Sequence, residues 1–383
     1  MDGPRDVVFT FSYVTWDGAQ RRGMHFAQDR LVARLLEDEG VDRLVVANWL
    51  RSAPAKAARA VLLRDDQPFP TAGRAVLHQP LRVRRRDPRG LPAIERTYRR
   101  YDRQLRHAAE RAGLHRPAVV TMHPLIAGFC PLEWAGPVTF YASDDWTAAP
   151  EYRRWWPAYE AAYQRIRASD RAVCAVSETI IRRIRPNGPH RVVPNGIEPA
   201  EWRALGEPPE WFAEIPPPRI LYVGTLDSRI DVSQLLATAK AFPEATIVLV
   251  GPLKEPGHLA LLADHDNIEI HDRIGRSEVP GLMAAADACI IPHVRTPFTA
   301  AMSPLKVYEY LAAGRPVAAV DLPPLRAVDP RVQLVSENGS FPRAVAAALS
   351  LGAASEPERI RFLEENSWQS RHEQVLDLVL RSE

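Results

Sequence analysis

The stretch SPLKVYEYLAAGRPVAAV, residues 303–320, has the pattern of a short helix that stops at a glycine and is followed by an apolar strand. Ser303 is a good N-cap, and Pro304 suits the first helical position because proline has no N–H group to leave unsatisfied there. We therefore predict that a helix begins at Ser303. Its free N–H groups and positive dipole end would form an anion site suited to phosphate.

Two charged residues lie near the start of this predicted helix. Lys306 and Glu309 are three residues apart and so share one helix face. A lysine is unfavourable at the positive end of a helix, so its presence there suggests that a bound anion offsets its charge. Glu309 is placed to accept hydrogen bonds from two hydroxyl groups, as on a ribose. The alternative for the two residues taken alone is a plain intrahelical ion pair, worth about 0.2–0.5 kcal/mol.

Short apolar runs alternate with helical patterns on both sides of this stretch, which is the rhythm of parallel βαβ units. One series occupies residues 1–200, a second occupies residues 219–355, and a proline-rich linker, residues 201–218, lies between them. The predicted fold class is α/β, with two Rossmann-like, doubly wound domains facing a cleft. The amphipathic end of the chain, residues 356–383, has helical spacing and is predicted to pack on one of these domains.

Composition excludes several classes of protein. A hydrophobic fraction of 46% is ordinary for a globular protein. No apolar run approaches the ~20 residues that span a bilayer, and the first residues, MDGPRDVVFTFSYV, lack the pattern of a signal peptide. The three cysteines are far apart, which argues against a disulfide framework or a zinc site. We therefore expect a cytoplasmic protein without a metal centre.

The net charge of +2 hides an uneven distribution. The chain carries +10 through Glu198 and −8 after it. A basic half attracts anions or an anionic membrane surface, or else the two halves attract one another, and both interpretations stay open. Nucleic acid is not an expected partner, because the chain has no finger or helix-turn-helix spacing and no basic strand interleaved with aromatics.

Arginines are concentrated in one part of the basic half. The run LRVRRRDPRG, residues 81–90, holds five of them, and the stretch ERTYRRYDRQLRHAAER follows with helical spacing. Ile94, Tyr98 and Tyr101 fall on one side of that helix, which is the pattern of an interfacial helix on an anionic membrane. The alternative is a solvated, arginine-rich loop and helix.

A series of short motifs follows the chain in a fixed order. They are FYASDDW (140–146), VVPNGIE (192–198), LYVGTLDSRIDVSQLL (221–236), Asp287 before an apolar strand and Pro292 after it, Pro304-Leu305-Lys306, Glu309-Tyr310-Leu311, AGRPV (313–317) and ENSWQSRHEQVL (365–376). Together they resemble the retaining GT-B glycosyltransferases of family 4, and especially the branch that includes the teichuronic acid transferases. The resemblance covers almost the whole chain and is strong from Arg191 onward. It also implies that the terminal helix, residues 356–383, crosses back to the first domain, residues 1–200, which would bind the acceptor.

The resemblance implies a nucleotide-diphosphate sugar as donor, with no separate cofactor and no metal. It implies that the helix start at Ser303, Pro304 and Leu305 meets the diphosphate and that Glu309 binds the ribose. Basic side chains would neutralise the leaving diphosphate. The usual arginine after the loop glycine is absent here, since Thr225 follows Gly224. The candidate cations are therefore Lys306 and Arg229, with Arg273 as a third; the segment Asp272, Arg273 and Ile274 would lie near the nucleobase.

The chain departs from the family at a second position. The glutamate that usually lies eight residues before the ribose-binding one is replaced by Ala301, and Thr299 is the candidate substitute for its contacts with the donor sugar. The family has no agreed protein nucleophile, and the leaving diphosphate is thought to take the acceptor's proton. The remaining candidates lie in the first domain: Asp144, Asp145 and His123 as catalytic groups, and Arg22, His25 and Tyr141 as contacts to a small-molecule or lipid-linked acceptor. For each of these the alternative is a structural role, such as helix capping by Asp144.

Three other functions remain to be distinguished. A non-hydrolysing sugar-nucleotide epimerase would use the same architecture without an acceptor. A nicotinamide-dependent dehydrogenase would need Gly-x-Gly-x-x-Gly after the first strand, but the chain has FSYVTWDGAQRRG there, which does not fit that motif. A non-catalytic binding protein would have no use for Lys306 and Glu309 beside a phosphate site.

Overall fold

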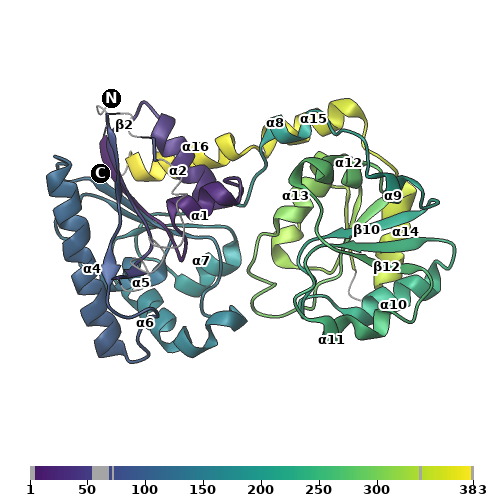
Figure 1. Ribbon diagram of the computed structural model, residues 1–383, viewed down its shortest axis with the longest axis horizontal. Coiled ribbons are helices and arrows are strands. Elements are labelled where there is room, and N and C mark those ends of the chain that lie inside the picture. The colour runs from purple at the N-terminus through teal and green to yellow at the C-terminus, as the bar shows by residue number, and fades with distance from the viewer. Residues whose placement is uncertain (1–4, 54–68, 71–72, 336–338, 381–383) are drawn as a thin grey trace. The chain divides into compact units, whose positions relative to one another are not determined.

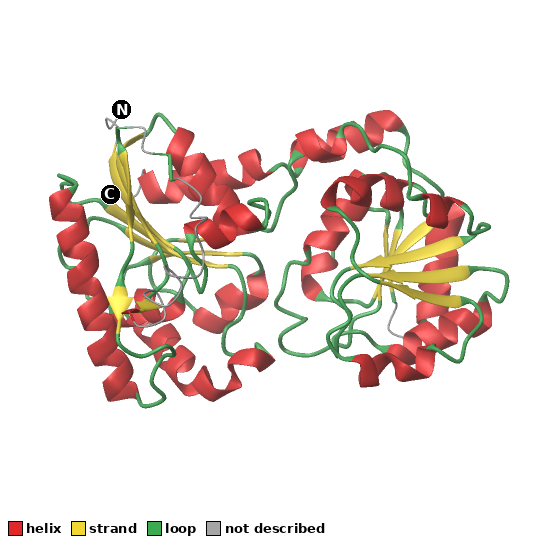
Figure 2. Ribbon diagram, viewed as in Figure 1, coloured by secondary structure: helices red, strands yellow, loops and turns green. Residues whose placement is uncertain are grey.

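The computed structural model describes residues 5–53, 69–70, 73–335 and 339–380. The chain divides into two compact units (Figure 1). Unit 1 is Met1–Pro194 together with Arg371–Glu383, and unit 2 is Asn195–Ser370. Each unit is built around a parallel β-sheet with helices packed against it (Figure 2), so the predicted α/β class with two Rossmann-like domains is confirmed.

Unit 1 contains a seven-stranded sheet in the order β4-β2-β1-β6-β7-β8-β9, with every neighbouring pair parallel. The apolar runs of the sequence form its central strands, which helices cover on both faces. A separate ladder joins β3 to β5. The strands of unit 1 are β1 (Arg5–Thr10), β2 (Val41–Ala47), β3 (Arg51–Ser52), β4 (Ala75–His78), β5 (Leu81–Arg82), β6 (Ala118–Thr121), β7 (Val138–Ala142), β8 (Ala172–Ala175) and β9 (His190–Val192).

The longest helix of unit 1 is α4 (Leu91–Arg111), which begins after Gly90. Its residues Ile94, Tyr98 and Tyr101 have no exposed surface, so they pack into the core. The prediction that these residues form an interfacial face is therefore wrong, because the apolar side of α4 is already covered by its own unit. The other helices of unit 1 are α1 (Trp16–Arg21), α2 (Ala27–Glu37), α5 (Pro124–Phe129), the 3-10 helix η1 (Pro150–Trp155), α6 (Trp156–Arg167) and α7 (Glu178–Ile184).

Unit 2 contains a six-stranded parallel sheet in the order β12-β11-β10-β13-β14-β15. Its strands are β10 (Arg219–Val223), β11 (Thr246–Val250), β12 (Ile268–His271), β13 (Ala288–Ile291), β14 (Val317–Ala319) and β15 (Val332–Leu334). Its helices are α8 (Pro199–Trp202), α9 (Glu210–Ala213), α10 (Val232–Ala241), α11 (Pro256–Leu259), η2 (Ala260–Leu262), η3 (Arg276–Glu278), α12 (Val279–Ala284), α13 (Leu305–Ala312), η4 (Pro323–Leu325), α14 (Phe341–Leu351) and α15 (Glu356–Glu365), followed by α16 (Trp368–Leu380).

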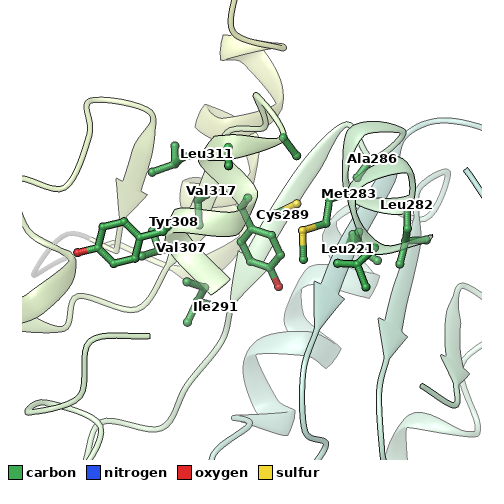
Figure 3. Close-up of a cluster of buried hydrophobic side chains, with 14 of the residues drawn as sticks. Leu221, Leu282, Met283, Ala286, Cys289, Ile291, Val307, Tyr308, Leu311 and Val317 are labelled. Atoms are coloured by element: carbon green, nitrogen blue, oxygen red, sulfur yellow. The ribbon is translucent and has the colours of Figure 1, made fainter. Parts of the chain in front are cut away.

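Two apolar clusters hold the sheet of unit 2, one on each face. The first packs α12 and α13 against the sheet, and the second packs α10 and α14 against the opposite face. Helix α13 contributes Val307, Tyr308 and Leu311 to the first cluster, beside Cys289 and Ile291 of β13 (Figure 3). This packing fixes the position of α13 and therefore the direction in which its polar residues Lys306 and Glu309 point.

The division into units differs from the expected boundaries. The expected linker, residues 201–218, includes α9, and its Phe212 is fully buried in the core of unit 2. Residues 356–383 were expected to form one segment of the first domain, but α15 belongs to unit 2 and α16 divides between the units at Ser370 and Arg371. Buried apolar side chains explain both differences, because a segment belongs to the core that its apolar residues fill.

Candidate active site

The candidate site lies where the strand order of unit 2 reverses direction. The chain passes from β10 outward through β11 to β12, then returns to the other side of β10 with β13. In open parallel sheets this switch point, at the carboxyl ends of the strands, is where ligands bind. The loops after β10 and β13 are joined here by hydrogen bonds from Asp231 N to Pro292 O and from Val294 N to Arg229 O, each 2.7 Å long.

Two glycines allow the backbone to come close at this point. Gly224 and Gly251 follow β10 and β11, and both have a φ of +148°. A Cβ on Gly251 would lie 2.0 Å from Gly224 O, and a Cβ on Gly224 would lie 2.9 Å from Lys306 Nζ. The predicted glycine loop is thus a close approach that only glycine permits, and it leaves room for the lysine.

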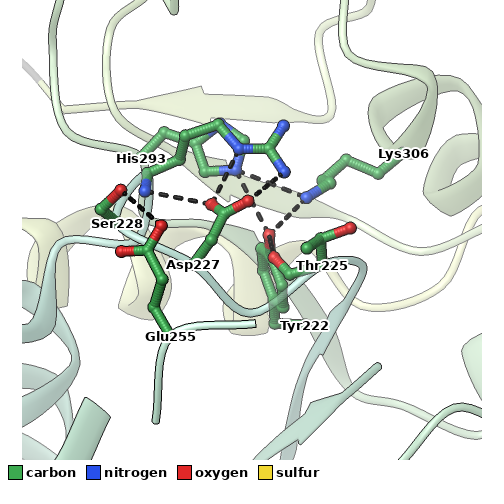
Figure 4. A network of polar contacts seen from close by, with 8 residues as sticks. Tyr222, Thr225, Asp227, Ser228, Glu255, His293 and Lys306 are labelled. Atoms are coloured by element: carbon green, nitrogen blue, oxygen red, sulfur yellow. Dashed lines mark hydrogen bonds and ion pairs between the residues drawn. The ribbon is translucent and has the colours of Figure 1, made fainter. Parts of the chain in front are cut away.

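Lys306 reaches from α13 to the end of β10 (Figure 4). Its Nζ donates a 2.6 Å hydrogen bond to the hydroxyl of Tyr222, lies 3.4 Å from Nε2 of His293 and stands 3.9 Å from the centre of the Tyr222 ring. The Tyr222 hydroxyl donates in turn to Thr225 O. Neither partner of the ammonium carries a negative charge.

Burial shifts the proton equilibria of this cluster. It lowers the pKa of Lys306 to about 7, and the positive charge of Arg229 acts in the same direction. Burial also lowers the pKa of His293 well below its usual value, helped by Lys306 and Arg229, so the imidazole is neutral. The Nδ1 of His293 is buried without a hydrogen-bond partner among the described residues. An anion placed here would stabilise the charged form of Lys306.

Arg229 is held by a carboxylate on its own loop. Its Nε and Nη2 each lie 2.8 Å from an oxygen of Asp227. Burial pushes the pKa of Asp227 upward, but the hydrogen bonds and charge of Arg229 more than offset this and hold it below its usual value. Thr225 contributes its carbonyl to the cluster through Tyr222. Arg229 is therefore oriented by Asp227 close to Lys306.

Glu309 does not pair with Lys306. Its Oε1 accepts a 2.6 Å bond from Nη1 of Arg276, and Nη2 of Arg276 lies 3.2 Å from Glu201. The intrahelical pair offered as the simpler interpretation is thus not formed. The side chain of Glu309 is 15% exposed, and that of Arg276 39%. The carboxylate therefore lies in the middle of α13, mostly covered, and is paired with Arg276 of η3, in the segment that follows β12.

The start of α13 differs from the expected one. The helix begins at Leu305, with Pro304 at the N-cap position and no side chain capping it. Ser303 is not the cap, because its hydroxyl accepts a hydrogen bond from Asn195 N and its carbonyl accepts from Asn195 Nδ2, at 3.2 and 2.6 Å. The Asn-Gly motif thus fixes the approach to α13.

The other predicted donor residues of unit 2 lie in two loops. Asp272, Arg273 and Ile274 follow β12; the first two are exposed, and Ile274 packs on the core beneath. Thr299 is buried, and its hydroxyl donates to Val294 O at 2.7 Å and accepts from Thr296 N. This hydroxyl shapes the loop between β13 and α13, and Ala301 beside it is fully buried.

His123 caps a helix in unit 1. It follows β6 and has no exposed surface, and its Nδ1 accepts from Leu125 N at the start of α5. Its Nε2 is buried without a partner in the described part of the chain. Burial, together with Arg82, lowers the pKa of His123 well below its usual value. The ring packs among aromatic side chains, the nearest being Trp49 at 4.3 Å and Tyr13 at 4.8 Å between ring centres.

The acidic pair follows β7. Asp145 is buried and accepts from the hydroxyl of Thr147 at 2.6 Å and from Thr147 N at 3.0 Å, so it shapes a turn. Asp144 is half-buried at the same strand end. Tyr141 lies within β7 and has no exposed surface, which places its ring in the core of unit 1.

Arg22 and His25 lie between α1 and α2. Arg22 pairs with the buried carboxylate of Asp29 through both Nε and Nη2, and stands over the ring of Phe26 at 4.9 Å. His25 is half-buried against Gly23. The structure thus gathers Lys306, Arg229 and Gly224 in unit 2. In unit 1, His123 and the acidic pair follow the neighbouring parallel strands β6 and β7, and the ring of His123 lies 5.1 Å from that of Trp146, next to Asp145. Arg22 and His25 lie apart from them, between α1 and α2.

Sequence reasoning missed three side chains of the site. They are Tyr222, His293 and Arg276. Tyr222 and His293 stand at the ends of the strands flanking the switch point, so strand order was the signal that would have found them. Arg276 had no local signal, because it lies 33 residues from Glu309.

No group of three or more His, Cys, Asp or Glu residues suited to a metal ion occurs within the described ranges. Among the helices of those ranges, none has both the length and the apolar content to cross a bilayer.

Comparison with known proteins shows similarity to a family of glycosyl transferases. Residues 217–351 match the family model described as "Glycosyl transferases group 1". A stretch of 104 residues, 27% of this chain, is 31% identical to a putative teichuronic acid biosynthesis glycosyltransferase, TuaH, of Bacillus subtilis (strain 168). This match spans 26% of that protein's length.

Solved structures resemble the whole chain. An alpha,alpha-trehalose 6-phosphate synthase from Burkholderia multivorans has a TM-score of 0.68 at 14% identity over 99% of this chain and 98% of that one. Alr3699/HepE of Anabaena, solved with UDP-glucose, has a TM-score of 0.60 at 14% identity over 99% and 100%. At such low identities these likenesses concern the fold. Residues 217–351 are therefore similar to the group 1 glycosyl transferases, and the chain as a whole has the GT-B fold.

Proposed function

We propose that this protein is a metal-independent, retaining glycosyltransferase that moves a sugar from a nucleotide-diphosphate donor to a hydroxyl group of an acceptor. The observation that carries the proposal is the ammonium of Lys306, which lies half-buried at the switch point of unit 2 and whose hydrogen-bond partners among the described residues are Tyr222 and His293. A buried cation without a contacting carboxylate is costly to keep charged. A bound diphosphate would supply the missing negative charge.

The site has the groups that such a reaction needs. As the bond from the sugar to the diphosphate breaks, negative charge grows on the leaving group, and Lys306 and Arg229 are placed to stabilise it. Asp227 partly neutralises the charge of Arg229 through an ion pair, so Lys306 has the larger role in stabilising the leaving group. Glu309, in the middle of α13, would accept hydrogen bonds from ribose hydroxyls. The leaving diphosphate would take the proton of the acceptor hydroxyl, which requires no protein base.

Other parts of the proposal rest on the relatives. Because a structure of Alr3699/HepE holds UDP-glucose, UDP-sugars are the first donors to test. The similarity to a teichuronic acid transferase supports a small-molecule or lipid-linked acceptor in cell-surface synthesis. Such a reaction would take place in the cytoplasm, where nucleotide sugars are made.

The test begins with nucleotide binding. UDP, GDP, ADP, CMP and dTDP are compared for their effect on the melting temperature, since a ligand that binds only the folded state stabilises it. We expect a diphosphate to stabilise the wild type and to have little effect on Lys306→Ala. The matched sugar nucleotide is then incubated with candidate acceptors. A product that forms without any acceptor would instead identify an epimerase, and the absence of diphosphate binding would refute the proposal.

A further inference from the structure

A cavity in unit 1 is lined by arginines. It has a volume of about 410 Å³ and lies between the segment that contains β5 and the exposed side of α4. Its lining residues are Leu50, Leu81, Arg82, Val83, Arg84, Arg86, Pro88, Ala93, Arg96, Thr97, Arg100 and Gln104. Five of the twelve are arginines and none is acidic, so the cavity is a concentrated positive site.

Most of this positive charge is not neutralised. Arg82 pairs with the buried carboxylate of Asp87. By contrast, Arg84, Arg86, Arg96 and Arg100 have no carboxylate within ion-pair distance among the residues that the structure describes. Four like charges around one cavity repel one another, and this arrangement is stabilised when an anion occupies the space between them.

The wall of the cavity is fixed in place. Gln104 of α4 accepts from Leu81 N at 3.0 Å and donates to Leu81 O at 3.1 Å. Asp87 accepts a hydrogen bond from the hydroxyl of Tyr98 at 3.3 Å in addition to its pair with Arg82. Since these contacts tie residues 81–87 to α4, the arginines are presented by an ordered surface rather than by a loose loop.

Apolar side chains are exposed at the same place. Val83 is 82% exposed, Leu81 40% and Leu91 42%. These are three of the nine large hydrophobic side chains that are exposed in the described residues, and they fall within eleven consecutive positions. A soluble anion would need only the arginines. A basic cavity bordered by exposed apolar side chains matches a bilayer surface, where phosphate groups lie directly above acyl chains.

We propose that this cavity binds the phosphate group of an anionic phospholipid, with Arg84, Arg86, Arg96 and Arg100 around the phosphate and Val83 entering the interfacial layer. The protein would thereby attach to the surface of an anionic membrane through unit 1. Only the purpose of this membrane binding rests on the proposed function: it would keep the enzyme near a lipid-linked acceptor. The binding itself depends on unit 1 alone.

The experiment measures sedimentation of the full-length protein with vesicles. Vesicles of phosphatidylcholine are compared with vesicles that also contain phosphatidylglycerol, at low and high salt. We expect binding only to the anionic vesicles and its loss at high salt. The double variant Arg96→Gln/Arg100→Gln should weaken this binding about tenfold or more, because each basic residue near the surface contributes to it. Val83→Ser should weaken it as well without affecting the fold, because the side chain is exposed.

A matched control separates the cavity from general charge. Arg103→Gln/Arg111→Gln removes two exposed arginines from the same helix that do not line the cavity. This control should bind anionic vesicles nearly as the wild type does. Equal weakening by the control pair would overturn the proposal in favour of diffuse attraction, and so would an absence of binding to anionic vesicles.

Two further measurements identify the source of the phosphate and the independence of the donor site. If inorganic pyrophosphate raises the melting temperature of the wild type but not of Arg96→Gln/Arg100→Gln, and vesicles do not bind, the cavity serves a soluble anion and the membrane assignment fails. The cavity variants should keep the stabilisation by nucleotide diphosphates that the wild type shows. A failure of the donor site is thus recognised separately from a failure of the membrane site.

Discussion

At the scale of single residues, the surroundings of Lys306 lower its pKa and so make its charge depend on what binds beside it. The ammonium is placed among Tyr222, His293 and Gly224, and in the described part of the chain no carboxylate lies within ion-pair distance of it. Its charged form is therefore unfavourable until an anion arrives. Binding of a diphosphate and protonation of Lys306 should favour one another.

Replacing Lys306 should alter stability in a pH-dependent way. Its pKa is lowered by burial from 10.5 to about 7 in the folded chain. Between these values the unfolded chain holds a proton that the folded chain lacks, so the stability of the wild type rises with pH across this window. We expect Lys306→Met to be more stable than the wild type at neutral pH, by about 1–3 kcal/mol once the lost hydrogen bond is considered.

Urea unfolding of both proteins at the two ends of that window checks this expectation. The advantage of Lys306→Met should shrink toward the alkaline end, where the lysine is neutral in both states. A difference that does not vary with pH would mean that Lys306 is charged in the folded protein.

Glu309 has two roles to separate, ribose binding and pairing with Arg276. Glu309→Gln should weaken nucleotide binding by about 1.5–3 kcal/mol, the usual cost of losing a hydrogen bond to a charged acceptor. Arg276→Gln removes the ion pair but keeps the carboxylate, and serves as the matched control. Calorimetry with the preferred nucleotide should show a much larger loss for Glu309→Gln. Equal losses would assign Glu309 a structural role.

At the scale of elements, the site depends on how closely the ends of β10, β11 and α13 approach one another. Val307, Tyr308 and Leu311 press α13 onto the sheet (Figure 3), while two glycines let the strand ends come together. The apolar residues of α13 therefore determine the position of Lys306, which lies on the polar face of the same helix.

Gly251→Ala should destabilise unit 2 by about 2 kcal/mol or more, because the new Cβ meets backbone and φ is positive. That contact, with Gly224 O at 2.0 Å, cannot be relieved by a side-chain movement. Gly257→Ala is the control, since no atom lies within 4 Å of its added Cβ. Thermal unfolding compares the two. Equal melting temperatures for both variants and the wild type would show that the close approach is not required.

At the scale of the whole molecule, the chain forms two units, each built on a parallel sheet and each with its own candidate site. The donor site belongs to unit 2, and the arginine cavity belongs to unit 1. The net charge is +10 through Glu198 and −8 after it. Phosphate recognition is therefore proposed twice, once by the half-buried Lys306 and once by a group of exposed arginines.

Sugar transfer should continue in the presence of EDTA. The proposed mechanism neutralises the diphosphate with side chains, so no metal ion is required for leaving-group stabilisation. Turnover is measured after dialysis against the chelator and again after magnesium or manganese is added. A loss of activity that either ion restores would contradict the proposed mechanism.

Much of the fold was predictable from the sequence. The apolar runs that contain β1, β2, β6 to β9 and β10 to β14 were recognised, because buried parallel strands are almost continuously apolar. The edge strands β4 and β15, most of whose residues are not buried, were not recognised. The start of α13 was misplaced because the Ser303 hydroxyl bonds to Asn195 instead of capping the helix.

The sequence by itself determined the architecture and the position of Lys306 and Glu309 near a helix start, because periodicity and helix signals are properties of neighbouring residues. Only the tertiary structure decided what these residues touch. Lys306 meets Tyr222, 84 positions away, and Glu309 meets Arg276, 33 positions away. Such pairs follow from the order of strands in the sheet and from the packing of α13, and separation along the chain contains no information about either.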